Sequence, residues 1–105
     1  MESKTLSNTT ASQAKDNVKD IQFWGDGDLF KLISKASSES EGWMKSTKAM
    51  EIPGSGCIVQ VTTQQRGLDF TYAVAEAVTF VPMVQIEEYK DEKGKVISRR
   101  LVRFV

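Results

Sequence analysis

The chain has 105 residues, enough for one domain with a single hydrophobic core and one modest groove. It is 40% hydrophobic and 27% charged, a composition typical of globular proteins, and its 14 basic and 14 acidic residues give zero net charge. No overall field would therefore draw it to nucleic acid or to an anionic membrane. With no histidine and one cysteine, the chain lacks the groups for histidine-dependent nucleophilic catalysis, the usual zinc sites or an intramolecular disulfide.

Residues 1–20 are mostly polar and offer little apolar surface to bury, so we expect a flexible N-terminal arm followed by one domain over residues 21–105. Residues 1–13 have no apolar core of the kind found in signal peptides. No apolar run approaches the roughly 20 residues of a membrane span. These features, together with the single cysteine, predict a cytoplasmic protein without membrane contact.

The first predicted element is a helix over residues 29–40. Asp26 or Asp28 could cap its start, because a carboxylate accepts hydrogen bonds from the free amides of a first turn. Apolar residues then follow at helical spacing, namely Leu29, Leu32, Ile33 and Ala36.

Residues 43–52 allow two interpretations. The helical stripe could continue through Trp43 to about Met50, or the segment could be an extended strand. We favour the strand, because residues 53–56, Pro-Gly-Ser-Gly, would then form a turn between two antiparallel strands.

Residues 57–65 carry the clearest strand pattern of the chain. Cys57, Val59 and Val61 alternate with residues that are mostly polar, which are Ile58, Gln60, Thr62 and Gln64. After a loop at Arg66 and Gly67, a second long segment repeats apolar residues on one side, namely Phe70, Tyr72, Val74, Val78 and Phe80. Glu76 falls on that same side and suggests a bulge or an exposed strand end. A helix over residues 72–77 is the alternative.

Residues 83–90 and 96–104 are predicted to form a hairpin around the polar turn at residues 91–95, in which Gly94 suits a positive φ. The predicted fold class is therefore α+β, with one N-terminal helix packed on a four- or five-stranded antiparallel meander.

No catalytic, cofactor or metal site is predicted. Cys57 has no histidine to activate it, and the Gly54-Ser55-Gly56 loop lacks the Gly-Lys-Ser/Thr ending of a phosphate-binding loop. Binding is the more natural role, and we expect no enzymatic activity. The candidate interaction surface consists of the polar strand side together with a nearby tryptophan and two arginines, namely Trp43, Gln60, Thr62, Gln64, Arg99 and Arg103.

Residues 42–65 and 75–82 resemble small uncharacterised proteins carried by temperate phages and prophages of enteric bacteria. The resemblance implies a phage accessory or host-interaction protein and carries no functional motif. We therefore expect a non-enzymatic interaction protein with an unidentified protein partner, and a homodimer is one arrangement this leaves open. The alternative is a nucleic-acid binder that uses a β-surface around Arg99 and Arg103, although the zero net charge argues against it.

Overall fold

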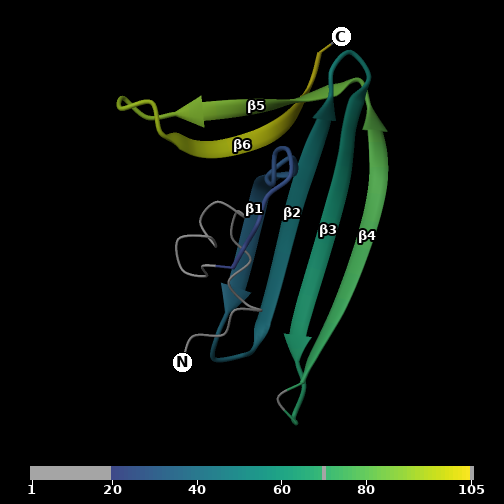
Figure 1. Ribbon diagram of the computed structural model, residues 1–105, viewed down its shortest axis with the longest axis vertical. Coiled ribbons are helices and arrows are strands. Elements are labelled where there is room, and N and C mark those ends of the chain that lie inside the picture. The colour runs from purple at the N-terminus through teal and green to yellow at the C-terminus, as the bar shows by residue number, and fades with distance from the viewer. Residues whose placement is uncertain (1–19, 70, 105) are drawn as a thin grey trace.

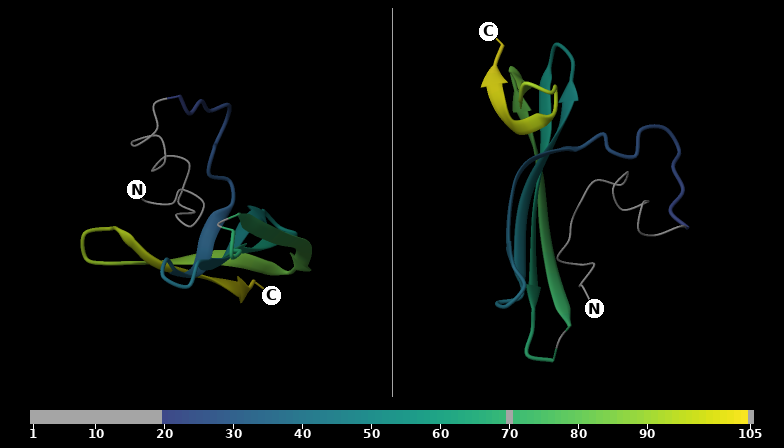
Figure 2. Two further views of the ribbon diagram at one scale, coloured as in Figure 1. Left: turned by 90° about the horizontal axis from the view of Figure 1, so that it is seen from below. Right: turned by 90° about the vertical axis from the view of Figure 1, so that its left-hand side faces the viewer.

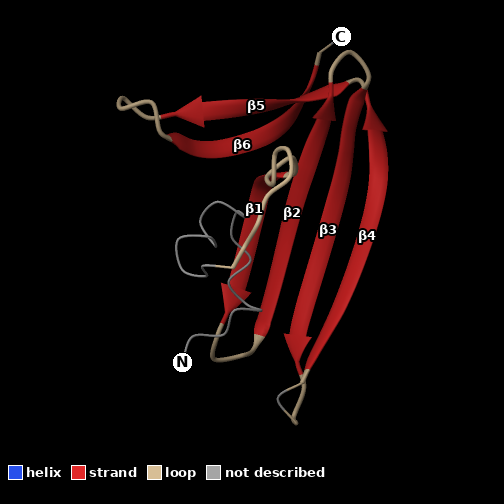
Figure 3. Cartoon of the chain, viewed as in Figure 1, coloured by secondary structure: helices blue, strands red, loops and turns tan. Residues whose placement is uncertain are grey.

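The computed structural model describes residues 20–69 and 71–104, and these form an all-β protein (Figures 1 and 3). The predicted arm at residues 1–20 lies outside the described residues except for Asp20, and so does Phe70. The described residues form six strands in succession: β1 (Lys31–Ser38), β2 (Trp43–Ile52), β3 (Gly56–Arg66), β4 (Tyr72–Pro82), β5 (Val84–Lys90) and β6 (Val96–Arg103).

The strands form two antiparallel sheets. The first contains four strands in the order β1-β2-β3-β4, so each strand pairs with its neighbours in sequence, and the second is the β5-β6 hairpin. Short connections between consecutive strands favour this meander. The antiparallel meander was predicted correctly, but the α+β class is wrong, because the described part of the chain contains no helix.

The predicted helix over residues 29–40 is instead β1. A bulge between Leu32 and Ser34 interrupts the pairing with β2, and Ile33 packs against the core from this position. The bulge breaks the two-residue alternation and leaves two apolar residues adjacent, as they would be on a helix. Asp26 caps no helix, and its Oδ1 accepts a hydrogen bond from the Asp28 amide at 2.8 Å within a turn.

The favoured interpretation of residues 43–52 as a strand is confirmed by β2, and the helical alternative is wrong. The predicted turn at residues 53–56 is also present. The Ser55 amide donates to the Ile52 carbonyl at 3.0 Å, and Gly54 has a φ of 77°. This conformation costs a residue with a side chain more than it costs glycine.

Strand β4 pairs with β3 without interruption from Tyr72, opposite Arg66, to Pro82, opposite Gly56. The expected bulge at Glu76 is therefore absent, and this residue lies exposed in the middle of the strand. The helical alternative for residues 72–77 is wrong as well.

The chain leaves the first sheet at a sharp corner after β4. Met83 has a φ of 65°, an uncommon value for a residue other than glycine, and its amide donates to the Ser55 carbonyl at 2.9 Å. The hairpin then runs across the end of the sheet (Figure 1). Its turn is as predicted: Gly94 has a φ of 83°, and Asp91 Oδ1 accepts from the amides of Lys93 and Lys95.

The hydrophobic core lies between this hairpin and one face of the four-stranded sheet, which we call the hairpin face (Figure 2). Ala49, Cys57 and Val59 are its buried members. Partly buried residues from both sheets pack around them, namely Ile33, Val81, Val84, Ile86 and Leu101. The small side chains of Ala49 and Cys57 allow the hairpin to approach the sheet closely.

Gly56 provides a direct test of this close packing. A Cβ atom there would lie 2.2 Å from the Val81 carbonyl oxygen and 2.8 Å from Pro82 Cα, both backbone atoms that cannot move aside cheaply. We expect Gly56→Ala to lower the free energy of unfolding by about 3 kcal/mol, measured by urea denaturation. At Gly54 the same Cβ would meet nothing within 4 Å. Gly54→Ala should therefore cost only about 1 kcal/mol from its positive φ, and equal losses would contradict this explanation.

Candidate functional site

The most distinctive surface of the molecule is the free edge of β4 together with the apolar side chains beside it. Among the described strands, β3 is the only one with which β4 makes extensive contact, and Figure 1 shows β4 at the outer border of the sheet. Val74, Val78 and Phe80 are 57%, 61% and 50% exposed. We call these three residues the apolar row. They share the face opposite the hairpin, because they pair with Gln64, Gln60 and Ile58 of β3.

The opposite edge of the sheet, at β1, has features that hinder pairing with another strand. It carries Lys31 and Lys35 and the bulge after Leu32. Arg99 of the hairpin also occupies the Leu32 carbonyl, with Nη1 donating to it at 3.1 Å. Charge, bulges and covering segments are the usual means by which edge strands avoid pairing with other chains.

Strand β4 lacks these protections. Its eleven residues include no lysine or arginine and no bulge, and its proline lies at the last position. Glu76 is its only charged residue. The edge of β4 therefore presents regularly spaced backbone donors and acceptors next to exposed apolar side chains, which is the arrangement that accepts an additional strand.

Glu76 is held against the sheet by two residues of the predicted interaction surface. Gln60 Nε2 and Thr62 Oγ1 both donate to Glu76 Oε1, at 3.3 and 3.2 Å. The carboxylate therefore points toward β3, away from the free edge. Glu76, which lies between the residues of the apolar row, is thus hydrogen-bonded to Gln60 and Thr62. The sequence pattern alone did not predict these hydrogen bonds.

The structure brings only part of the predicted interaction surface together. Gln64 lies on the same face as Gln60 and Thr62, and its buried Oε1 has no hydrogen-bond partner among the described residues. Trp43 lies on the hairpin face, because it pairs with Gln65 rather than with Gln64. Its Nε1 donates to Glu41 at 3.1 Å. The tryptophan is therefore on the opposite face from Gln60, Thr62 and Gln64, beside which it was expected to lie.

The two predicted arginines are on β6 and have different surroundings. Arg99 Nε donates to Glu88 Oε2 at 2.7 Å, in addition to its contact with the Leu32 carbonyl. This hydrogen bond is the main reason why the pKa of Glu88 is lowered. Arg103 is exposed and lies opposite Val84 in the hairpin. Arg99 thus ties the hairpin to the first sheet.

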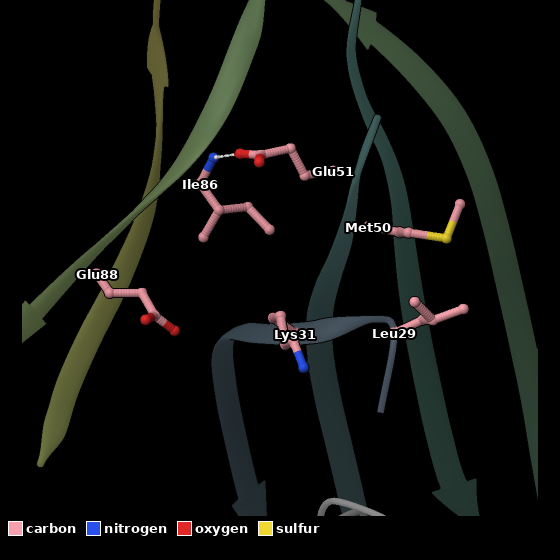
Figure 4. Close-up of a pocket in the computed structure, with 6 residues that line it drawn as sticks. All are labelled: Leu29, Lys31, Met50, Glu51, Ile86 and Glu88. Atoms are coloured by element: carbon pink, nitrogen blue, oxygen red, sulfur yellow. Dashed lines mark hydrogen bonds between the residues drawn. The ribbon is translucent and has the colours of Figure 1, made fainter. Parts of the chain in front are cut away.

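A groove of about 340 Å³ lies between the hairpin and the sheet (Figure 4). Each charged side chain that lines it has a partner. Glu51 accepts a hydrogen bond from the Ile86 amide at 2.8 Å, and Glu88 forms an ion pair with Arg99. Lys31 Nζ lies 3.7 Å from Asp26 Oδ2. The groove is lined by Leu29, Lys31, Met50, Glu51, Ile86 and Glu88. This pattern is typical of a junction between two sheets.

Cys57 is fully buried at that junction, and its Sγ lies 3.6 Å from the Val84 carbonyl oxygen. Burial, with a smaller effect from the negative charge of Glu51, raises the pKa of the thiol. The side chain therefore remains protonated at neutral pH and packs the core. Within residues 20–69 and 71–104, no group of three or more histidine, cysteine or acidic side chains could hold a metal ion.

The sequence pattern predicted β4 as a strand but did not identify its edge as a candidate site. The alternation around Glu76 identifies a strand, but only the strand order shows that no other described strand pairs with its outer side. The described residues also include no helix long and apolar enough to cross a membrane.

The fold and this surface define a small all-β protein that combines a meander sheet, open at one edge, with a crossing hairpin. The chain belongs to the Lockin family, whose family model matches residues 1–101. No curated protein and no solved structure matches the chain significantly.

Replacing Arg99 tests its role in joining the two sheets. Arg99→Ala removes the ion pair with Glu88 and the hydrogen bond to Leu32, and we expect a loss of about 1–2 kcal/mol in the free energy of unfolding. The matched control is Arg103→Ala on the same strand, which should change stability by less than about 0.5 kcal/mol. Equal effects would contradict the assignment.

The same pair predicts a pH dependence. The pKa of Glu88 is lower in the folded protein than in the unfolded chain, so its contribution to stability is present at neutral pH and is lost as the pH falls through the folded pKa. The stability of Glu88→Gln should therefore decline less steeply on acidification than that of the wild type. Parallel declines in urea titrations between neutral and acidic pH would contradict this.

The buried state of Cys57 predicts slow thiol chemistry. Because the pKa of the thiol is raised and its side chain is inaccessible, we expect a disulfide reagent at pH 8 to label the native protein far more slowly than the urea-unfolded chain. The absorbance of the released thiolate follows the reaction. Equal rates in the two states would show that the core opens readily at this position.

Proposed function

We propose that this Lockin family protein is a non-enzymatic interaction protein that binds a protein partner by adding a strand to the free edge of β4. The observation that carries the proposal is an eleven-residue edge strand without the protection seen at β1. Cytoplasmic location and an origin in phages or prophages are part of the same proposal, and the genes that neighbour this one would test the origin.

Strand addition explains how such a small surface could provide both affinity and specificity. The backbone groups of β4 would supply main-chain hydrogen bonds to any extended segment, whatever its sequence. The apolar row would supply selectivity, because Val74, Val78 and Phe80 contact alternate residues of an added strand. Small residues on the other side of β4, Ala73, Ala75 and Ala77, leave its backbone accessible.

The nucleic-acid alternative stays a second proposal. Arg99 is engaged with Glu88 and the Leu32 carbonyl, so a phosphate would have to compete with contacts that hold the hairpin to the sheet. Arg103 alone provides little of the multiple phosphate neutralisation on which such binding depends.

A charge introduced in the apolar row should abolish partner binding. Val78→Glu places a carboxylate at a position that is 61% exposed, so the fold should tolerate it while an added strand would have to desolvate the charge. We expect proteins that co-purify with the tagged wild type from its host to be lost, at least roughly tenfold, with the variant. Quantitative mass spectrometry of the eluates measures this.

The matched control is Ile97→Glu, which makes the same kind of change at a residue of β6 that is 65% exposed. It should retain the wild-type partners. Loss with both variants, or with neither, would contradict a binding site at β4.

A further inference from the structure

We infer that the strand added to β4 is β4 of a second copy of this chain, paired antiparallel about a two-fold axis at Ala77. The inference rests on the proposed function, because it takes the β4 edge as the binding surface, and it names the partner. Two meanders joined in this way would form one continuous eight-stranded sheet, with a hairpin near each end.

The geometry of an edge-to-edge dimer restricts the residue pairs. When two antiparallel edge strands extend one sheet, the two-fold axis is perpendicular to that sheet, so each face of one copy continues into the same face of the other. Ala77 is the midpoint of Tyr72–Pro82. An axis at this residue pairs all eleven residues of β4 and leaves none of its length unpaired.

The side chains fit this register. On the face of the apolar row, Val74 lies opposite Phe80 of the second copy, and Glu76 lies opposite Val78. Two Val-Phe contacts therefore flank the axis, and apolar cross-strand pairs of this kind stabilise antiparallel sheets. On the hairpin face the paired side chains are small: Ala77 lies opposite Ala77 of the second copy, and Ala75 lies opposite Thr79.

Electrostatics separates this register from its neighbour. An axis at Glu76 would also match apolar residues, but it would place the two carboxylates directly opposite each other, which is destabilising. An axis at Ala77 avoids this contact. Gln60 and Thr62 also hold each carboxylate toward its own β3, away from the axis. The zero net charge of the chain adds no general repulsion between copies.

A second copy fits the edge better than a partner of strong charge. The strand offers one acidic residue and no basic residue for pairing with a charged segment. Its apolar residues are distributed on both sides of its midpoint, so the strand is complementary to itself when reversed. Strand addition buries a small area, and we therefore expect a weak dimer with a Kd of roughly 1–100 µM.

Two opposite charges at one position test both the dimer and its register. Val78→Glu would place carboxylates opposite Glu76 of the second copy at two symmetric contacts and should raise the Kd at least roughly tenfold. Val78→Lys would place an ammonium group opposite the same carboxylate, so the dimer should persist with a Kd within about threefold of the wild type. Ile97→Glu is the control distant from the edge. Sedimentation equilibrium measures all four proteins, and circular dichroism verifies their folds.

Three results would overturn the inference. A wild type that stays monomeric throughout the expected concentration range would rule out the dimer. Equal weakening by Val78→Glu and Val78→Lys would rule out the axis at Ala77, because residue 78 would not then face a carboxylate. A dimer that both variants leave unchanged would place the interface elsewhere.

Cysteine cross-linking provides a second measurement that does not depend on the charged variants. In the proposed dimer the two Ala77 Cα atoms lie about 5 Å apart, within disulfide range, so Ala77→Cys should cross-link under mild oxidation. Ala75→Cys is the matched control, since the two copies of residue 75 would be offset by four residues, about 13 Å along the strand. Cross-linking of Ala75→Cys in place of Ala77→Cys would contradict the register.

Failure of this inference can be distinguished from failure of the proposed function. A monomeric wild type whose host partners still disappear with Val78→Glu would retain the β4 binding site and reject the second copy as its occupant. A dimer that responds to charge as predicted, with host partners unaffected by Val78→Glu, would support self-pairing and reject capture of another protein at this edge.

Discussion

The packing of the hairpin against one end of the sheet is the interaction on which the rest of the structure depends. A single four-stranded sheet cannot bury a core alone, and Ala49, Cys57 and Val59 are buried where β5 and β6 cross β2 and β3. A second group of buried residues, Met44, Ser46 and Thr62, lies on the opposite face of the sheet. Ala49 and Cys57 keep the two layers close, and Arg99 reinforces the contact through Glu88 and Leu32. The same placement leaves most of β4 outside this contact, and Val81 is the residue of β4 that packs against the core cluster.

Local chemistry made much of the fold predictable. The turn at residues 53–56 and the hairpin around Gly94 follow from glycine and proline at positions where the backbone must reverse. Strand β3 follows from its two-residue alternation. The helix at residues 29–40 was predicted wrongly because a bulge in β1 imitates helical spacing, and no local signal separates the two when pairing with β2 supplies the stability.

The candidate site was predictable only in part. Gln60 and Thr62 were identified as a polar strand side, and the structure adds the reason for their position, since both donate to Glu76. The importance of β4 could not be read from its own residues, because an edge strand is defined by the neighbour that is missing. Trp43 was placed beside Gln60, Thr62 and Gln64 because residues 43–52 were expected to pair with the next strand. The pairing is present, but opposite Gln65 the tryptophan lies on the other face.

The corner at Met83 determines whether the sheet remains extendable. An ordinary hairpin turn after β4 would have placed β5 beside β4 as a fifth strand of the first sheet. The edge of β4 would then have been covered. Instead, proline ends the strand at Pro82, and the left-handed conformation of Met83 turns the chain across the end of the sheet. The conformation of Met83 thus explains why β5 does not pair with β4, and why no other described strand covers this edge of the sheet.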